Sequence, residues 1–257
     1  MRLRSAASAI VVAIVGTTMI GVSGRTAPPG QPPDGNPNLE GVWQALNTAS
    51  WDLRDHPASL GVPAGQGVVV GKEIPYQPWA AVQQKENFEK RATADPETNC
   101  LLPGVPRITY MPFPFQIAQT ADEVTFLYEY VGAFRVIDTT GTRPERPLPS
   151  YMGDSRGRWD GNTLVVDVTK FNGDTWFDRA GNFHSDALHV VERYTPMGPD
   201  HLMYEVTVED PTVFTQPWKI AMPLYRRKEP DIQTLEYECA AYAFEEKYLQ
   251  NSTQSAR

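Results

Sequence analysis

Alternating apolar and polar positions run through the chain from residue 115 onward and predict β-strands. Side chains two residues apart point to the same face of a strand, so Val124, Phe126, Tyr128 and Tyr130 form one apolar face between more polar neighbours. The same pattern, with β-branched and aromatic residues bounded by turn residues, predicts strands over 115–119, 123–130, 134–137, 156–159, 163–168, 188–194, 202–209, 218–224 and 234–239.

Short connections limit how these strands can pair. Asp160-Gly161-Asn162 separates two of them and is typical of a hairpin turn. The remaining gaps are too short for the crossover helices that parallel βαβ units require. We therefore expect an all-β fold, an antiparallel up-and-down barrel of the lipocalin or calycin type, because closure removes exposed sheet edges. A β-sandwich is the alternative.

The part of the chain before residue 115 is irregular. A first strand is expected around Gly41-Val42-Trp43, and residues 80–92 have a composition that suits one short helix. The rest of the stretch from residue 48 to residue 97 has no regular hydrophobic period. The barrel is therefore expected to carry an irregular N-terminal segment.

The N-terminus has the order of features found in secretory signal peptides. Arg2 and Arg4 precede an apolar run over 5–22, and Ser23-Gly24 follow as small residues. An uncleaved membrane anchor is the alternative, because this run is about long enough to span a bilayer. We expect a signal peptide over 1–24, a Pro-rich spacer over 25–38, a single barrel domain over 39–245 and a polar tail over 246–257. The protein is then periplasmic or secreted, without membrane insertion after cleavage.

The charge of the chain indicates which partners it can bind, and its cysteine content indicates whether it contains a disulfide. The formal net charge is −8 and the Lys and Arg residues form no cluster, which argues against nucleic acid as a partner. In an oxidising compartment an even cysteine count favours a disulfide, here between Cys100 and Cys239. It would tie the segment before strand 115–119 to the last predicted strand. Two separate buried thiols are the alternative.

Several motifs together resemble a known set of proteins. They are NCLLPGVPR at 99–107, PFQI at 114–117, GDSRGRWDGNTLVVD at 153–167, HSDALHVVER at 184–193, EDP at 209–211 and PW at 217–218. The chain thereby resembles a widespread family of secreted bacterial proteins of unassigned function, from about residue 39 to residue 239. This resemblance implies no mechanism. Separately, Gly41-Val42-Trp43 is similar to the G-x-W motif of lipocalin-like barrels.

The strongest candidate for catalysis is a histidine cluster at the start of strand 188–194. Imidazole is the usual general acid or base near neutral pH, and a neighbouring carboxylate fixes its tautomer. His184 or His189 would be the base and Asp186 the group that orients it. Because His189 points away from the other two in a continuous strand, the three converge only if the chain bends between them. The alternative is that His184 is a surface residue and His189 a hydrogen-bonded core residue.

Other polar and aromatic side chains would complete such a site. Arg156 or Tyr130 would stabilise developing negative charge, and the residues expected to bind substrate are Tyr128, Arg135, Asp154, Arg158 and Trp218. Arg156 and Arg158 share one strand face, which lines a cavity or faces water. Arg135 extends outward or reaches into the lumen. Gly153-Asp154-Ser155-Arg156-Gly157 matches G-x-S-x-G, but no helix follows it, so we expect a turn rather than a nucleophilic serine.

No cofactor is expected. A Zn or Mn site at the histidine cluster would need a third ligand, for which Glu192 is the candidate, and neither H-x-H nor H-E-x-x-H occurs. The chain also has no glycine-rich loop of the kind that binds nucleotides.

Three functions remain open at this point. The first is an exported, cofactor-independent enzyme of the hydrolase, lyase or isomerase type, acting on a small organic substrate inside the barrel. The second is a non-catalytic binder or carrier of an apolar or aromatic ligand, and the third is an envelope interaction module. The sequence does not specify the oligomeric state.

Overall fold

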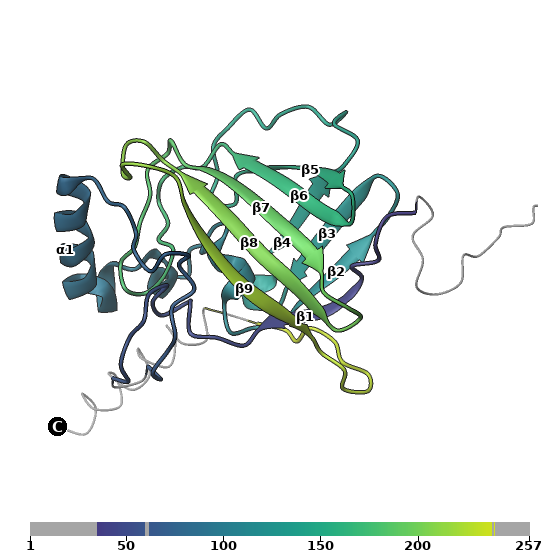
Figure 1. Cartoon of the computed structure of the whole chain (residues 1–257), viewed down its shortest axis with the longest axis horizontal. Coiled ribbons are helices and arrows are strands. Elements are labelled where there is room, and N and C mark those ends of the chain that lie inside the picture. Colours follow the sequence, from purple (N-terminus) through teal and green to yellow (C-terminus); the bar gives the residue numbers. More distant parts are fainter. Residues whose placement is uncertain (1–34, 60–61, 238, 240–257) are drawn as a thin grey trace, which may run out of the picture.

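The computed structural model describes residues 35–59, 62–237 and 239 and is almost entirely β-structure (Figure 1). The predicted signal peptide, most of the spacer and the polar tail lie outside the described residues. Nine strands form one closed barrel. Their bounds are β1 Gly41–Ala45, β2 Phe115–Gln119, β3 Glu123–Tyr128, β4 Phe134–Asp138, β5 Asp154–Asp160, β6 Thr163–Thr169, β7 His189–Pro196, β8 His201–Glu209 and β9 Trp218–Arg226.

The strand order follows the chain. Each strand pairs with its sequence neighbours, and β9 pairs with β1 to close the barrel. All pairs are antiparallel except β4 and β5, which run parallel and share the single register pair Asp138 and Arg156. The predicted lipocalin-like barrel is thus confirmed. The parallel pair was not foreseen, because the connection from residue 139 to residue 153 runs outside the barrel without a helix.

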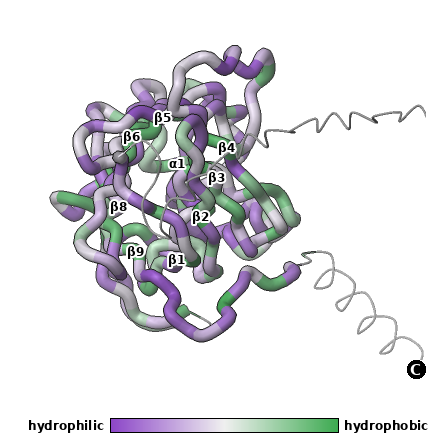
Figure 2. The backbone as a smooth tube through the Cα atoms, turned by 90° about the vertical axis from the view of Figure 1, so that its right-hand side faces the viewer, coloured by the Kyte–Doolittle hydropathy of each residue, from purple (hydrophilic) through white to green (hydrophobic). Residues whose placement is uncertain are grey.

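Alternate residues of β7, β8 and β9 are buried and fill the barrel. In β7, for example, Val190, Glu192 and Tyr194 are buried, whereas the alternate residues His189 and Val191 are partly exposed. Figure 2 shows hydrophobic and hydrophilic stretches interspersed over the barrel. The aromatic side chains of the lumen touch one another, as in the pairs Phe115–Phe126, Phe126–Tyr194 and Tyr194–Tyr204.

The G-x-W motif closes the barrel at the junction of β1 and β9. The Trp43 indole N–H donates to the carbonyl oxygen of Leu39 at 2.8 Å, and the Arg226 guanidinium lies over its ring at 4.3 Å from the centroid. Arg226 also donates to the carbonyl of Glu40. A Cβ at Gly41 would lie 2.1 Å from Arg226 Nη1 and would displace this guanidinium, and the φ of +135° at this position also favours glycine.

Within the described residues, one α-helix and three short 3₁₀ helices accompany the barrel. Helix α1 spans Pro78–Ala94, close to the prediction, and begins with a proline, which needs no N–H partner there. It buries Ala80 and Gln84 and is tied to the segment after β6, because Gln84 Nε2 donates to the Ala180 carbonyl at 2.7 Å. Three short 3₁₀ helices follow: η1 Pro96–Asn99, η2 Arg107–Tyr110 and η3 Tyr130–Gly132.

Two strand predictions were wrong in detail. The strand predicted over 123–130 ends at Tyr128, and Tyr130 begins η3 instead. No strand forms in the described part of 234–239. The physical reason is that β1 already occupies the free edge of β9, so a closed barrel offers no further strand a partner.

The predicted disulfide is confirmed between Cys100 and Cys239, with Cα atoms 5.7 Å apart. Cys100 ends η1 in the left-handed conformation. The bond therefore joins η1 to the segment after β9, rather than to a last strand as expected.

Arginine side chains reinforce the parallel seam between β4 and β5. On the outer face, the Arg143 guanidinium donates to the carbonyl of Val136 in β4 and to that of Ser155 in β5, both at 3.1 Å. It also pairs with Asp154 at 3.3 Å. On the inner face, Arg135 Nε donates to the Ser155 hydroxyl at 2.7 Å. Side chains thus supply hydrogen bonds that one register pair cannot.

Replacing Arg143 tests this reinforcement. Arg143→Ala leaves two strand carbonyls and Asp154 without this donor, so we expect a loss of about 1–2 kcal/mol in the free energy of unfolding, measured in urea. Arg146→Ala is the control, because Arg146 is half-exposed and lies 3.9 Å from the same carboxylate; it should change stability by less than about 0.5 kcal/mol. Equal effects of the two substitutions would contradict the role given to Arg143.

Candidate functional site

A groove of about 1230 Å³ lies outside the barrel, between α1, the segment after β1, η1 and the C-terminal segment. We call it the α1 groove. Its walls carry the aromatic side chains Trp51, Phe88, Phe113 and Tyr237 and the cationic side chains Arg54, Lys85, Arg91 and Arg179. Cys239 of the disulfide also lines it. A large concave site with aromatic walls and a few polar groups is typical of small-molecule binding.

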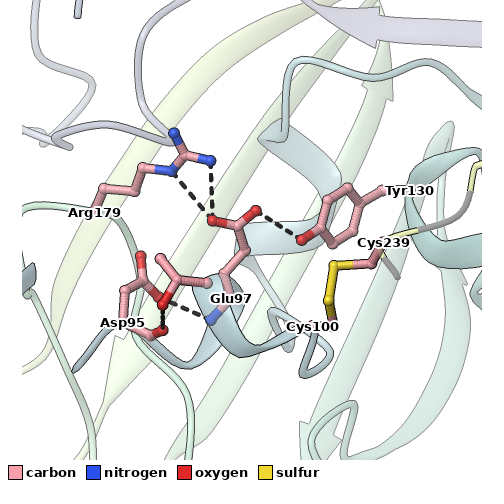
Figure 3. The surroundings of a disulfide bond; sticks show 7 residues. Asp95, Glu97, Cys100, Tyr130, Arg179 and Cys239 are labelled. Atoms are coloured by element: carbon pink, nitrogen blue, oxygen red, sulfur yellow. Dashed lines mark hydrogen bonds and ion pairs between the residues drawn. A yellow bond between two sulfur atoms is a disulfide. The ribbon is translucent and has the colours of Figure 1, made fainter. Parts of the chain in front are cut away.

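Glu97 is nearly buried and lines the groove, and Figure 3 shows its carboxylate between Arg179 and Tyr130. Its Oε2 accepts hydrogen bonds from Arg179 Nε and Nη2, at 3.2 and 3.0 Å, and its Oε1 accepts one from the Tyr130 hydroxyl at 2.7 Å. Burial and the charge of Glu97 raise the pKa of Tyr130 above its usual value. Tyr130 was predicted to stabilise negative charge on a substrate; in the structure its hydroxyl donates a hydrogen bond to the Glu97 carboxylate.

A buried ion pair holds η1, and with it Glu97, in place. Arg107 donates through both terminal nitrogens to Asp95, at 2.8 and 2.7 Å, and both side chains are almost fully buried. Asp95 also accepts from the backbone N–H of Glu97 and so caps η1. Because Arg107 belongs to η2, this pair fixes η1 and the Glu97 side chain against the end of the barrel.

Two guanidinium groups of the walls lie against aromatic rings. Arg179 lies over Trp51 at 6.0 Å, and Arg91 over Phe88 at 4.0 Å. Tyr237 packs against Phe113, with ring centroids 5.1 Å apart. Phe88 is 43% exposed, so its ring is accessible to a ligand from the groove.

Asp178 anchors the wall that carries Trp51 and Arg179. Its carboxylate accepts hydrogen bonds from the backbone N–H of Leu53 at 2.8 Å and from both nitrogens of Asn182. Burial, then the nearby Asp52 carboxylate, raise the pKa of Asp178 to about 7, although these hydrogen bonds favour the charged form. Arg179 N–H also donates to the Ser50 carbonyl at 3.0 Å. These bonds hold the two wall segments side by side.

The predicted histidine cluster does not converge. His184 is buried between Phe171 and Phe177, its Nδ1 donates to the Ser185 carbonyl, and its Nε2 accepts from the Thr175 hydroxyl at 2.7 Å. Burial lowers the pKa of His184. Asp186 is exposed in the loop, and His189 lies on the outer face of β7. The chain does bend before β7, but it turns His184 into the core rather than toward His189.

His189 bridges two carboxylates across neighbouring strands. Its Nε2 lies 3.1 Å from Asp167 of β6, and its Nδ1 lies 3.2 Å from Glu209 of β8. Partial burial alone lowers the pKa of His189, but the hydrogen bonds and charges of Asp167 and Glu209 outweigh it and raise the pKa above the usual value. The arrangement suits a protonated imidazole that donates from both nitrogens.

The lumen contains a polar network around Glu192. Arg135 adopts the inward one of its two predicted orientations and forms an ion pair with Glu192. The other Glu192 oxygen accepts from the hydroxyls of Tyr194 and Tyr204, at 3.0 and 2.6 Å. Tyr128, predicted to bind substrate, lies in the same lumen and is 3.3 Å from the Thr109 hydroxyl of η2. Arg135, Glu192 and their partners are almost completely buried.

The remaining predicted residues lie away from this network. Asp154, Arg156 and Arg158 are on the outer face of β5, and Arg156 pairs with Asp154 at 2.9 Å beneath the loop from residue 139 to residue 153. The lumen-lining alternative for the two arginines was therefore wrong. Trp218 is buried at one end of the barrel against Phe177 and Phe214.

The residues weighed for a metal site are separated in the same way. Glu192 lies in the lumen and pairs with Arg135, whereas His184 and His189 are bonded to other groups. In the part of the chain that the structure describes, no group of three or more His, Cys, Asp and Glu side chains is arranged to hold a metal ion.

The α1 groove was missed because its residues come from irregular segments. Trp51, Phe88 and Arg179 lie in two loops and a weakly amphipathic helix, where no periodicity marks a shared face. One sequence signal was usable: the motif NCLLPGVPR, which contains Cys100 and Arg107, begins two residues after Glu97.

Comparison with known proteins gives no further guide, because no family model, curated protein sequence or solved structure matches the chain. The resemblance to secreted bacterial proteins stays a prediction from the motifs. Within the described residues, no helix is long and apolar enough to cross a membrane.

The His189 bridge predicts a pH-dependent contribution to stability. Because the folded-state pKa is raised, the stabilisation is fully present below the usual histidine pKa of about 6.5 and is lost as the pH rises through the folded value. His189→Gln should therefore destabilise the protein by up to about 1 kcal/mol near pH 6 and have little effect near pH 9. Urea unfolding at both pH values measures this. His201→Gln, at another outward-facing position, is the control for the loss of a surface imidazole; a pH-independent effect of His189→Gln would refute the bridge.

Removing the charge of Glu192 should be costly. Glu192→Gln leaves the buried Arg135 guanidinium without its counter-ion, so we expect a loss of about 3 kcal/mol in the free energy of unfolding. The control is Glu205→Gln, because Glu205 faces outward on the adjacent strand β8 and should change stability by less than about 0.5 kcal/mol. If Glu192→Gln matches this control, the network does not stabilise the barrel.

Proposed function

We propose that the protein is exported and binds a small apolar or aromatic ligand in the α1 groove, without chemical conversion. The observation that carries this proposal is the groove itself: four aromatic side chains and four cationic side chains border about 1230 Å³. Such a site provides apolar area for a ring and a few polar groups to orient it.

The catalytic alternative has less support. It requires His184, Asp186 and His189 to converge on one cavity, but His184 is buried in the core and His189 is bonded to two carboxylates on the outer surface. Neither imidazole borders the α1 groove. Binding without conversion needs no general base and agrees with the satisfied hydrogen bonds of Glu97.

Export is supported by two independent features. The first 24 residues have the charge, apolar run and small residues of a signal peptide. The disulfide between Cys100 and Cys239 persists in the oxidising compartments to which such peptides direct a protein. A periplasmic or secreted location is thus part of the proposal.

A neutral fluorescent probe, N-phenyl-1-naphthylamine, tests the binding proposal on disulfide-bonded protein. We expect saturable binding of one probe per chain, with Phe88→Ala raising the Kd about five- to tenfold because an accessible ring contact is lost. Phe134→Ala is the matched control, since Phe134 is 67% exposed on the outside of the barrel, and it should leave the Kd unchanged.

The proposal fails if the probe shows no saturable binding, or if Phe88→Ala and Phe134→Ala change the Kd equally. Circular dichroism of each variant verifies that the barrel is folded.

A further inference from the structure

We propose that the ligand of the α1 groove is an aromatic anion, with its negative group held by Arg179 and its ring packed between Trp51 and Phe88. This inference rests on the proposed function and specifies the ligand class for the same site. It follows from which charges in the groove are already paired and which still face solvent.

Three of the four carboxylates that border the groove accept hydrogen bonds from the protein, although one of them, Asp55, is still 58% exposed; the fourth, Glu89 of α1, is exposed. Glu97 is 9% exposed and accepts from both Arg179 and Tyr130. Asp52 is 16% exposed and pairs with Arg54 at 3.3 Å. Asp55 accepts from the Gly67 N–H at 2.7 Å and lies 3.7 Å from Lys72. A cationic ligand would have to compete for these acceptors.

The cationic groups remain accessible. Arg54 and Arg179 have side chains that are 37% and 46% exposed, and Lys85 and Arg91 of α1 are also exposed. The groove thus offers accessible cationic groups to an incoming ligand, although four carboxylates also border it and the chain as a whole has a net charge of −8. Locally focused charge of this kind selects ligands of the opposite sign.

Arg179 is the best placed of these groups. Its Nε and Nη2 are directed at Glu97, and its third nitrogen, Nη1, points away from that carboxylate in Figure 3. Two bonds to Glu97 fix the plane of the guanidinium, so little conformational entropy is lost when Nη1 donates to a ligand. The Trp51 ring lies beside the same guanidinium, and a planar ligand can thus stack on one side while its anionic group meets Arg179.

Three probes of the same shape and different charge test the ligand class: 2-naphthoate, 2-naphthamide and 2-naphthylmethylammonium. Isothermal titration calorimetry on the disulfide-bonded protein should give a Kd for 2-naphthoate at least tenfold below that of the cation, with the amide between them. The advantage of the anion should shrink in 0.5 M NaCl, because partly exposed charges are screened.

Arg179→Gln should remove the preference for 2-naphthoate while leaving the Kd of neutral 2-naphthamide within about twofold, which shows that the groove is intact. Arg179→Lys should retain part of the preference. Arg146→Gln is the control, because it removes a half-exposed arginine from a different loop, and it should keep the preference in full.

The outcomes separate the inference from the function on which it rests. Equal affinity for the three probes, tighter binding of the cation, or an unchanged preference in Arg179→Gln overturns the aromatic-anion inference alone. If neither 2-naphthamide nor N-phenyl-1-naphthylamine binds, the proposed function itself fails.

Discussion

The barrel depends on how its one parallel pair of strands is held together. A closed sheet requires every neighbouring pair of strands to stay hydrogen-bonded, and β4 and β5 share a single register pair. Arg143 bridges their carbonyls from outside, and Arg135 reaches Ser155 from inside. Arg135 then continues to Glu192 of β7, so a side-chain bridge in the lumen also ties the seam to β7.

This constraint gives a structural reason for several conspicuous sequence features. Ser155 of the GDSRGRW segment receives Arg135, Asp154 receives Arg143 and Arg156, and Gly157 allows close approach, since a Cβ there would lie 2.6 Å from Ile137. Residues that suggest chemistry in the sequence therefore stabilise the scaffold. The lumen is packed with mutually contacting aromatic rings and a satisfied carboxylate, and the accessible groove lies outside the barrel beside α1.

Much of the fold was predictable because strand alternation is a local signal. The face formed by Val124, Phe126 and Tyr128 follows directly from the period of two, and β2 matches its predicted bounds. The disulfide followed from cysteine count and compartment. The parallel seam and the missing strand after β9 were not predictable, because both depend on which edge is free once the barrel has closed.

The candidate site was less predictable than the fold. Sequence proximity suggested that His184, Asp186 and His189 act together, yet a turn before β7 places one in the core and one on the surface. In contrast, Trp51, Phe88 and Arg179 are far apart in the sequence. They come to one groove because Asp178 binds the Leu53 N–H of the Trp51 loop, and Gln84 binds α1 to the Ala180 carbonyl. Contacts between such distant segments produce no periodic pattern in the sequence, so they cannot be predicted from it.

Hydrogen–deuterium exchange with and without saturating N-phenyl-1-naphthylamine tests most directly whether ligands bind outside the barrel. If they do, added protection should be confined to α1, to η1 and to the wall segments that contain Trp51 and Arg179. Protection of β3, β4, β7 and β8, whose side chains surround the Glu192 network, would instead place the ligand in the lumen and contradict the proposed site.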